Sequence, residues 1–63
     1  MCLASVYSKS DGKEKLIADR VIRIQIDEQM GEILCVNLFG ERVMLSGKLE
    51  YIDFQNSCVK ISR

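Results

Sequence analysis

The sequence predicts an all-β fold, a small antiparallel barrel or half-barrel of about six short strands. Polar and apolar side chains alternate in several short segments, and turn signals recur about every 8 to 12 residues. The chain has 63 residues and no proline, and nothing in its composition marks a linker, so residues 1–63 are expected to form one domain. A domain of this size buries only roughly 60% of the surface that its unfolded chain exposes. A second subunit is therefore an expected source of stability.

The first half of the chain is expected to supply three strands. The first begins near the N-terminus and ends before the Asp11-Gly12 pair, which is a strong turn signal. A short strand is predicted at Glu14–Ile17 and a longer one at Arg20–Asp27, where β-branched residues concentrate. Good helix formers leave open an alternative, one short helical turn at residues 13–19.

The second half is expected to supply three further strands. In the first of them Leu34, Val36 and Leu38 are predicted to form the buried side. The segments Tyr51–Phe54 and Cys58–Ser62 alternate in the same manner and are predicted to be the last two strands. The four aromatic residues are expected in the core or in an interface; they are Tyr7, Phe39, Tyr51 and Phe54.

Charge and hydropathy exclude several classes of partner. The chain carries nine basic and nine acidic residues and no histidine, and the basic residues are scattered among the acids. Because phosphate contacts depend on clustered positive charge, nucleic acid is not an expected partner. No apolar run approaches the roughly 20 residues needed to span a bilayer, and no signal-peptide pattern is recognisable. We therefore expect a cytoplasmic protein with no membrane partner.

The three cysteines, Cys2, Cys35 and Cys58, are too few and too widely spaced for a disulfide framework or a Cys-x-x-Cys motif. A reducing compartment is the simplest setting for them. Cys35 is expected to be a small structural residue, and Cys58 receives no function. Glu41 and Asp53 are acidic, but no nucleophile, histidine base or oxyanion motif accompanies them, so we expect no enzymatic activity.

Cys2 is the candidate metal ligand, and the alternative is a small apolar residue on the first strand. The terminal amine, the backbone nitrogen between Met1 and Cys2, and the Cys2 sulfur can close two fused five-membered chelate rings on one metal ion. If Met1 is removed, the new amine and the thiolate still close one ring, and a second chain must then complete a square plane. Nitrogen and thiolate donors suit Ni(II) or Cu(II) rather than Mg(II) or Ca(II).

Three segments carry a resemblance to a known family: Met1–Tyr7, Val36–Glu41 and Ile52–Phe54. Together they resemble the CooT family of small nickel-binding proteins, over essentially the whole chain. The resemblance implies a homodimeric metallochaperone with a small β-barrel, which binds Ni(II) through the cysteine after the initiator methionine, here Cys2. Members are associated with nickel delivery to carbon monoxide dehydrogenase, and some are labelled as predicted RNA-binding proteins.

We therefore expect a cytoplasmic nickel-binding accessory protein that holds Ni(II) through Cys2, with Met1 as a further donor, at a homodimer interface. Carbon monoxide dehydrogenase or another nickel enzyme is the expected recipient. The alternative function is a small-barrel RNA-binding module. A contiguous cluster of arginine and lysine beside an exposed aromatic residue would favour that alternative.

Overall fold

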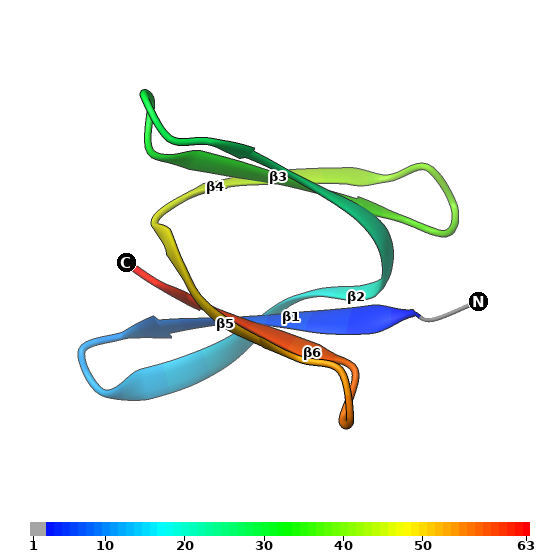
Figure 1. The fold of residues 1–63 in the computed structure, drawn as a ribbon, viewed down its shortest axis with the longest axis horizontal. Coiled ribbons are helices and arrows are strands. Elements are labelled where there is room, and N and C mark those ends of the chain that lie inside the picture. Colours follow the sequence, from blue (N-terminus) through cyan, green and yellow to red (C-terminus); the bar gives the residue numbers. More distant parts are fainter. Residues whose placement is uncertain (1–2) are drawn as a thin grey trace.

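A computed structural model describes residues 3–63, and their regular structure is entirely β-strand. The six strands are β1 (Ala4–Ser10), β2 (Lys13–Asp27), β3 (Glu32–Asn37), β4 (Arg42–Ser46), β5 (Lys48–Asp53) and β6 (Cys58–Ser62). They form one sheet in the order β4-β3-β2-β1-β6-β5, which curls over a core without closing (Figure 1). This confirms the predicted all-β class, in its half-barrel form. Residues 3–63 contain no helix of the length and hydropathy needed to cross a membrane.

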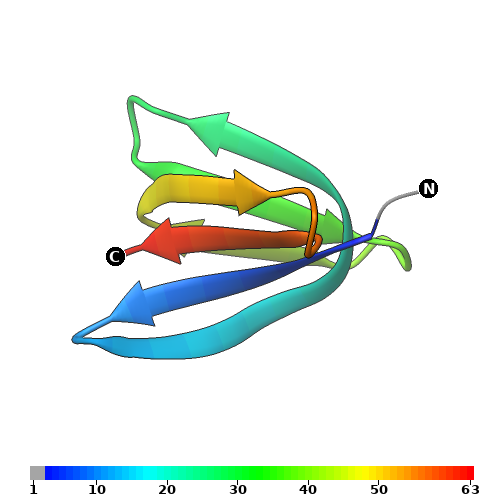
Figure 2. The same cartoon turned by 60° about the horizontal axis from the view of Figure 1, so that its bottom comes forward.

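The two strands predicted at Glu14–Ile17 and Arg20–Asp27 are one continuous strand, β2. It bends sharply, so that its first half lies beside β1 and its second half beside β3 (Figure 2). Arg20 lies at the bend with a φ of 53°, a conformation that is uncommon for a residue with a Cβ. The break expected between two strands is therefore a bend within one strand.

The alternative prediction of a helical turn at residues 13–19 is wrong. Those residues extend along β1 as an antiparallel partner, with Leu16 opposite Tyr7 and Ala18 opposite Val6. Pairing with β1 outweighs the helix propensity of these residues, because helix propensity is a weak preference that tertiary context routinely reverses.

One pairing departs from the predicted antiparallel arrangement. β1 and β6 run parallel, with Val6 beside Val59 and Ser8 beside Ile61. The other strand pairs are antiparallel. In a simple meander β5 would pair with β4, but here the β5–β6 hairpin lies on the free side of β1 and pairs with it through β6. The sheet therefore has two edge strands, β4 and β5, which are adjacent in the sequence.

The core lies between two layers of the curled sheet (Figure 1). One layer contains β3, β4 and the second half of β2, and the other contains β1, β5, β6 and the first half of β2. Apolar side chains from both layers fill the space between them, and the fully buried ones are Val6, Val21, Ile33, Cys35, Val59 and Ile61. We call the side of each strand that faces this core the inner face and the other side the outer face.

The buried side of β3 is the opposite of the predicted one. Ile33 and Cys35 are 0% and 1% exposed, whereas Leu34 and Val36 are only partly buried and Leu38 is exposed. Both parities of this strand are apolar, so alternation alone did not decide between them. The register decides it, because Cys35 is paired with Val43 of β4 and with Ile24 of β2, which pack against the core.

Candidate functional site

The two predicted metal donors, Met1 and Cys2, lie outside the described residues, so their role as ligands is a prediction that the structure leaves untested. The described chain begins at Leu3, one residue after Cys2. The site is therefore built from the surface that surrounds the start of β1.

An apolar groove of about 280 Å³ lies at this end of the molecule. Three parts of the chain form it: the start of β1, the bend of β2, and the β5–β6 hairpin with its turn. Its apolar lining consists of Leu3, Ala4, Val21, Ile22, Ile24, Ile52, Phe54 and Val59. Several of these side chains are large and uncovered; Ile22 is 49% exposed, Ile52 is 44% exposed and Phe54 is 86% exposed. Surface of this kind marks an interaction site.

The turn between β5 and β6 holds Phe54 beside the groove. The backbone amides of Gln55 and Asn56 donate to Oδ1 of Asp53 at 3.0 and 3.1 Å, and the Asn56 side-chain amide donates to Oδ2 at 2.8 Å. The hydrogen bonds from Asn56 and Gln55 lower the pKa of the Asp53 carboxyl, because they stabilise its charged form. Asp53 therefore caps the turn that carries Phe54.

The two described cysteines differ in environment. Cys35 is 1% exposed on the inner face of β3, and burial raises the pKa of its thiol. A buried, protonated thiol is a poor metal ligand, since metals bind the thiolate. Cys58 is half-buried on β6, opposite Asp53 of β5 and beside Ser5 of β1. Both cysteines are free, as expected.

No group of three or more cysteine and acidic side chains that could hold a metal ion occurs within residues 3–63. Glu41, like Asp53, serves a turn: its carboxylate accepts a hydrogen bond from the Asn37 side-chain amide at 2.7 Å. Asn37 Oδ1 in return accepts the amides of Phe39 and Glu41 at 2.9 Å. Both acids thus serve as turn residues, and the described residues offer no alternative group of metal ligands to the one predicted at Met1 and Cys2.

A second cavity, of about 430 Å³, lies between the bend of β2 and the β3–β4 turn. Arg20, Arg42, Asp19, Glu41 and Phe39 are among its lining residues. The Phe39 ring is 67% exposed, and the Arg20 guanidinium carbon lies 5.7 Å from its centroid, within the range of a cation–π contact. The cavity collects an equal number of basic and acidic residues.

The sequence did not reveal either cavity. Each one joins residues that are far apart in the chain, and the contacts depend on the bend of β2 and on the parallel β1–β6 pairing. The aromatic residues were predicted to lie in the core or in an interface. Phe39, Tyr51 and Phe54 do not lie in the core, since they are 67%, 51% and 86% exposed.

Two comparisons with known proteins give the same family. The model of the family described as "CO dehydrogenase accessory protein CooT" matches residues 1–62. A crystal structure assigned to CooT from Carboxydothermus hydrogenoformans is similar to this chain at 27% sequence identity, with a TM-score of 0.85. The alignment covers 98% of this chain and 97% of that one. No curated protein matches the chain.

Proposed function

The chain belongs to the CooT family of carbon monoxide dehydrogenase accessory proteins, and on that premise we propose that it binds Ni(II) through Cys2 at a homodimer interface. The observation that supports the proposal is the apolar groove at the start of β1. Leu3 lines the groove and follows Cys2 in the sequence, so a partner seated there would lie close to the candidate thiolate.

We take the partner in the groove to be a second copy of the chain. A domain this small gains little stability from its own core, and the exposed Ile22, Ile52 and Phe54 offer further apolar area to bury. Two-fold symmetry would bring the N-terminal segments of two chains to one interface, because an isologous contact uses the same patch on both subunits. Four donors, a nitrogen and a sulfur from each chain, would then be available for a square plane.

The donor chemistry supports Ni(II) as the cargo. The described residues contain no competing group of ligands, so the terminal amine, an amide nitrogen and the Cys2 thiolate are the donors on which the proposal depends. Copper(II) would bind such donors more tightly than nickel, and discrimination would therefore come from metal availability in the cell. Because thiol and amine must lose protons to bind, nickel affinity should fall as the pH falls.

The role is one of binding and delivery rather than catalysis. The family's description names carbon monoxide dehydrogenase as the enzyme that its members assist, and we propose that this chain delivers nickel to that enzyme or to another nickel enzyme, in the cytoplasm. If Met1 is retained, one chain supplies three donors and leaves a fourth position open. A recipient's ligand could occupy that position before the first donors release the metal.

An anaerobic titration with nickel tests the proposal. Wild-type protein with a free N-terminus should bind nickel, and Cys2→Ser should lose most of the affinity. Cys35→Ala, the control at a thiol that does not line the groove, should bind as the wild type does. Mass spectrometry of each sample should establish whether Met1 is present. Equal affinity and stoichiometry in Cys2→Ser and wild type would reject Cys2 as the ligand.

A second candidate function, RNA binding, is favoured by one observation. Arg20 and Arg42 gather beside the exposed ring of Phe39 at the second cavity, an arrangement that suits the stacking of an unpaired base. Asp19 and Glu41 line the same cavity and cancel its charge, which is why this function ranks second. Salt-dependent binding of single-stranded RNA that is lost in Phe39→Ala would support it, and the absence of such binding would reject it.

A further inference from the structure

The outer face of β2, β3 and β4 carries three rows of side chains with different chemistry. The register of the strands defines them, because residues directly opposite one another point to the same side of a sheet. A basic row consists of Arg23, Val36 and Arg42; a middle row consists of Gln25, Leu34 and Met44; an acidic row consists of Asp27, Glu32 and Ser46. The face thus has a basic end, an apolar centre and an acidic end.

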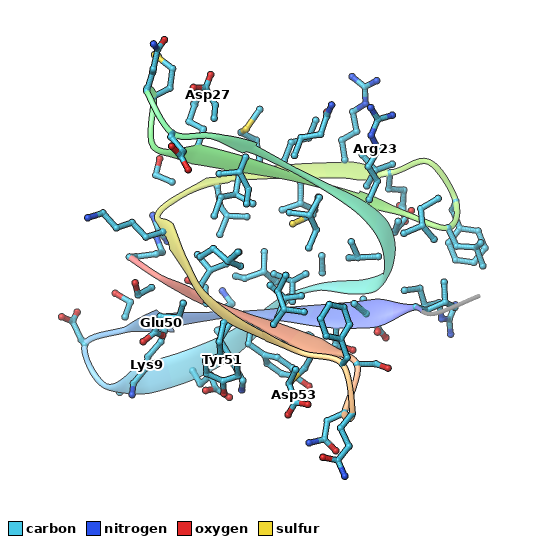
Figure 3. The ribbon with its side chains drawn as sticks, viewed as in Figure 1. Lys9, Arg23, Asp27, Glu50, Tyr51 and Asp53 are labelled. Carbon is cyan, nitrogen blue, oxygen red and sulfur yellow. The ribbon has the colours of Figure 1, made fainter. Side chains whose placement is uncertain are left out.

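The ends of this face are well separated and accessible. Arg23 and Asp27 lie at opposite ends of the layer and point away from the core (Figure 3). Both residues are exposed, and so is Arg42. At the centre, Met44 is 58% exposed beside the partly buried Leu34. A hollow of about 190 Å³ lies between this centre and the acidic row.

We propose that this face is a self-association surface, on which a second copy of the chain packs face to face with its basic row over the acidic row of the first. A two-fold axis along the middle row produces this arrangement, because it turns one face over and exchanges its two ends. Two arginines then meet two carboxylates at each end, and Leu34 and Met44 meet their own copies at the centre. The pattern is complementary to itself, which selects a second copy over another partner.

This surface meets the groove at one residue, Arg23, which lines both. The groove is formed by the start of β1, the bend of β2 and the β5–β6 hairpin, and the other eight residues of the three rows do not line it. Rows on one face of a strand are about 7 Å apart and strands are about 4.8 Å apart, so the face is small beside a standard interface of about 800 Å² per partner. The association is therefore weak and, being partly electrostatic, sensitive to salt.

Sedimentation velocity at increasing protein concentration, in low and in high salt, tests the proposal with two charge-reversed variants. Arg23→Glu/Arg42→Glu makes both ends acidic, and Glu32→Lys/Ser46→Lys makes both ends basic. Asp27 is left in place because its carboxylate accepts the backbone amides of Gln29 and Met30 in the β2–β3 turn. Lys9→Glu/Lys13→Glu is the control, with two reversals of charge on the exposed β1–β2 hairpin.

The wild type and the control should show an association step that high salt removes. Each face variant alone should lose this step, and an equimolar mixture of the two face variants should regain it. The absence of the step in the wild type, its persistence in either face variant, or the failure of the mixture to regain it would overturn the proposal. Recovery in the mixture also shows that both variants are folded.

The outcome is distinguishable from that of the nickel proposal. A groove dimer is held by apolar contacts and should survive high salt, and Cys2→Ser should leave the salt-sensitive step unchanged. Equal nickel affinity in the wild type and in Glu32→Lys/Ser46→Lys, whose two changed residues do not line the groove, is the accompanying expectation.

Discussion

Leu3 and Phe54 line the same groove, although one precedes the first strand and the other lies in the last turn of the chain. The parallel pairing of β1 with β6 brings them together, since it places the start of β1 beside the β5–β6 hairpin. The segment that precedes β1 and the most exposed aromatic side chain of the described chain therefore border one groove. The proposed dimer depends on it.

Replacing Phe54 with aspartate should weaken the homodimer and leave the monomer folded. The side chain is 86% exposed, so the monomer should lose no more than about 0.5 kcal/mol of unfolding free energy. A charge at the groove, by contrast, would be buried without a partner in the dimer. Light scattering coupled to gel filtration measures the change. Phe39→Asp is the control and should remain dimeric; equal dimerisation of Phe54→Asp and wild type would show that the groove is not the interface.

The Cys35 thiol should resist modification in the native protein. It is 1% exposed and its pKa is raised by burial, so little thiolate is present at neutral pH. Labelling with a thiol reagent, followed by mass spectrometry, should modify Cys58 faster than Cys35. Cys35→Ala should also leave nickel affinity unchanged, and a loss of affinity in that variant would mean that the buried thiol contributes to the site.

Gly47 should not tolerate a side chain. This residue joins the edge strands β4 and β5 at a φ of 151°, and a Cβ would lie 2.6 Å from the carbonyl oxygen of Ser62 and 3.0 Å from Cγ2 of Ile61. Gly47→Ala should therefore lower the unfolding free energy by about 1–3 kcal/mol, measured in urea at one fixed protein concentration. Gly40→Ala is the matched control, because Gly40 also has positive φ but has no atom within 4 Å of the added Cβ. A smaller loss is expected there, and equal losses would contradict the clash.

Acid should destabilise the fold partly through Asp53. Hydrogen bonds in the turn lower the pKa of its carboxyl below the ordinary value of 3.8. A carboxyl with a lowered folded pKa stabilises the fold above its unfolded pKa, and this contribution is lost as the pH falls through the folded value. The urea concentration at the unfolding midpoint should therefore decrease once the pH is below about 4. The decrease should be less steep in Asp53→Asn, which keeps an acceptor oxygen without the charge. Parallel curves for the two proteins would be the contrary result.

Most of the strands could be predicted from the sequence because their alternation and turn signals are local. The exception is β4 (Arg42–Ser46), which was not predicted, and the expected number of six was reached because β2 was divided into two strands. The Asp11-Gly12 turn occurs where it was expected, with φ of 53° and 75° at these two residues. The bend at Arg20 could not be predicted, since a positive φ at a residue other than glycine leaves no sign in the sequence. The buried side of β3 was mistaken for a related reason: Leu34 and Cys35 are both apolar, and only the pairing with β2 and β4 shows which one faces the core.

The candidate site likewise has one part that could be predicted from the sequence and one part that could not. Cys2 was proposed from its position and chemistry, which need no tertiary information, and its role stays a prediction. The groove beside it could not be predicted, because it needs the start of β1, the bend of β2 and the β5–β6 turn to meet. The turn that Asp53 caps is local, whereas the place of Phe54 beside the groove depends on the same long-range arrangement.

Native mass spectrometry of nickel-loaded protein tests the central claim most directly, because it reports metal content and subunit number for the same ion. The protein must have a free N-terminus with no tag before Met1. We expect nickel on the dimer of the wild type and none on Cys2→Ser, which should still form the dimer. An equal nickel load on Cys2→Ser, or nickel carried by the wild-type monomer alone, would contradict the account.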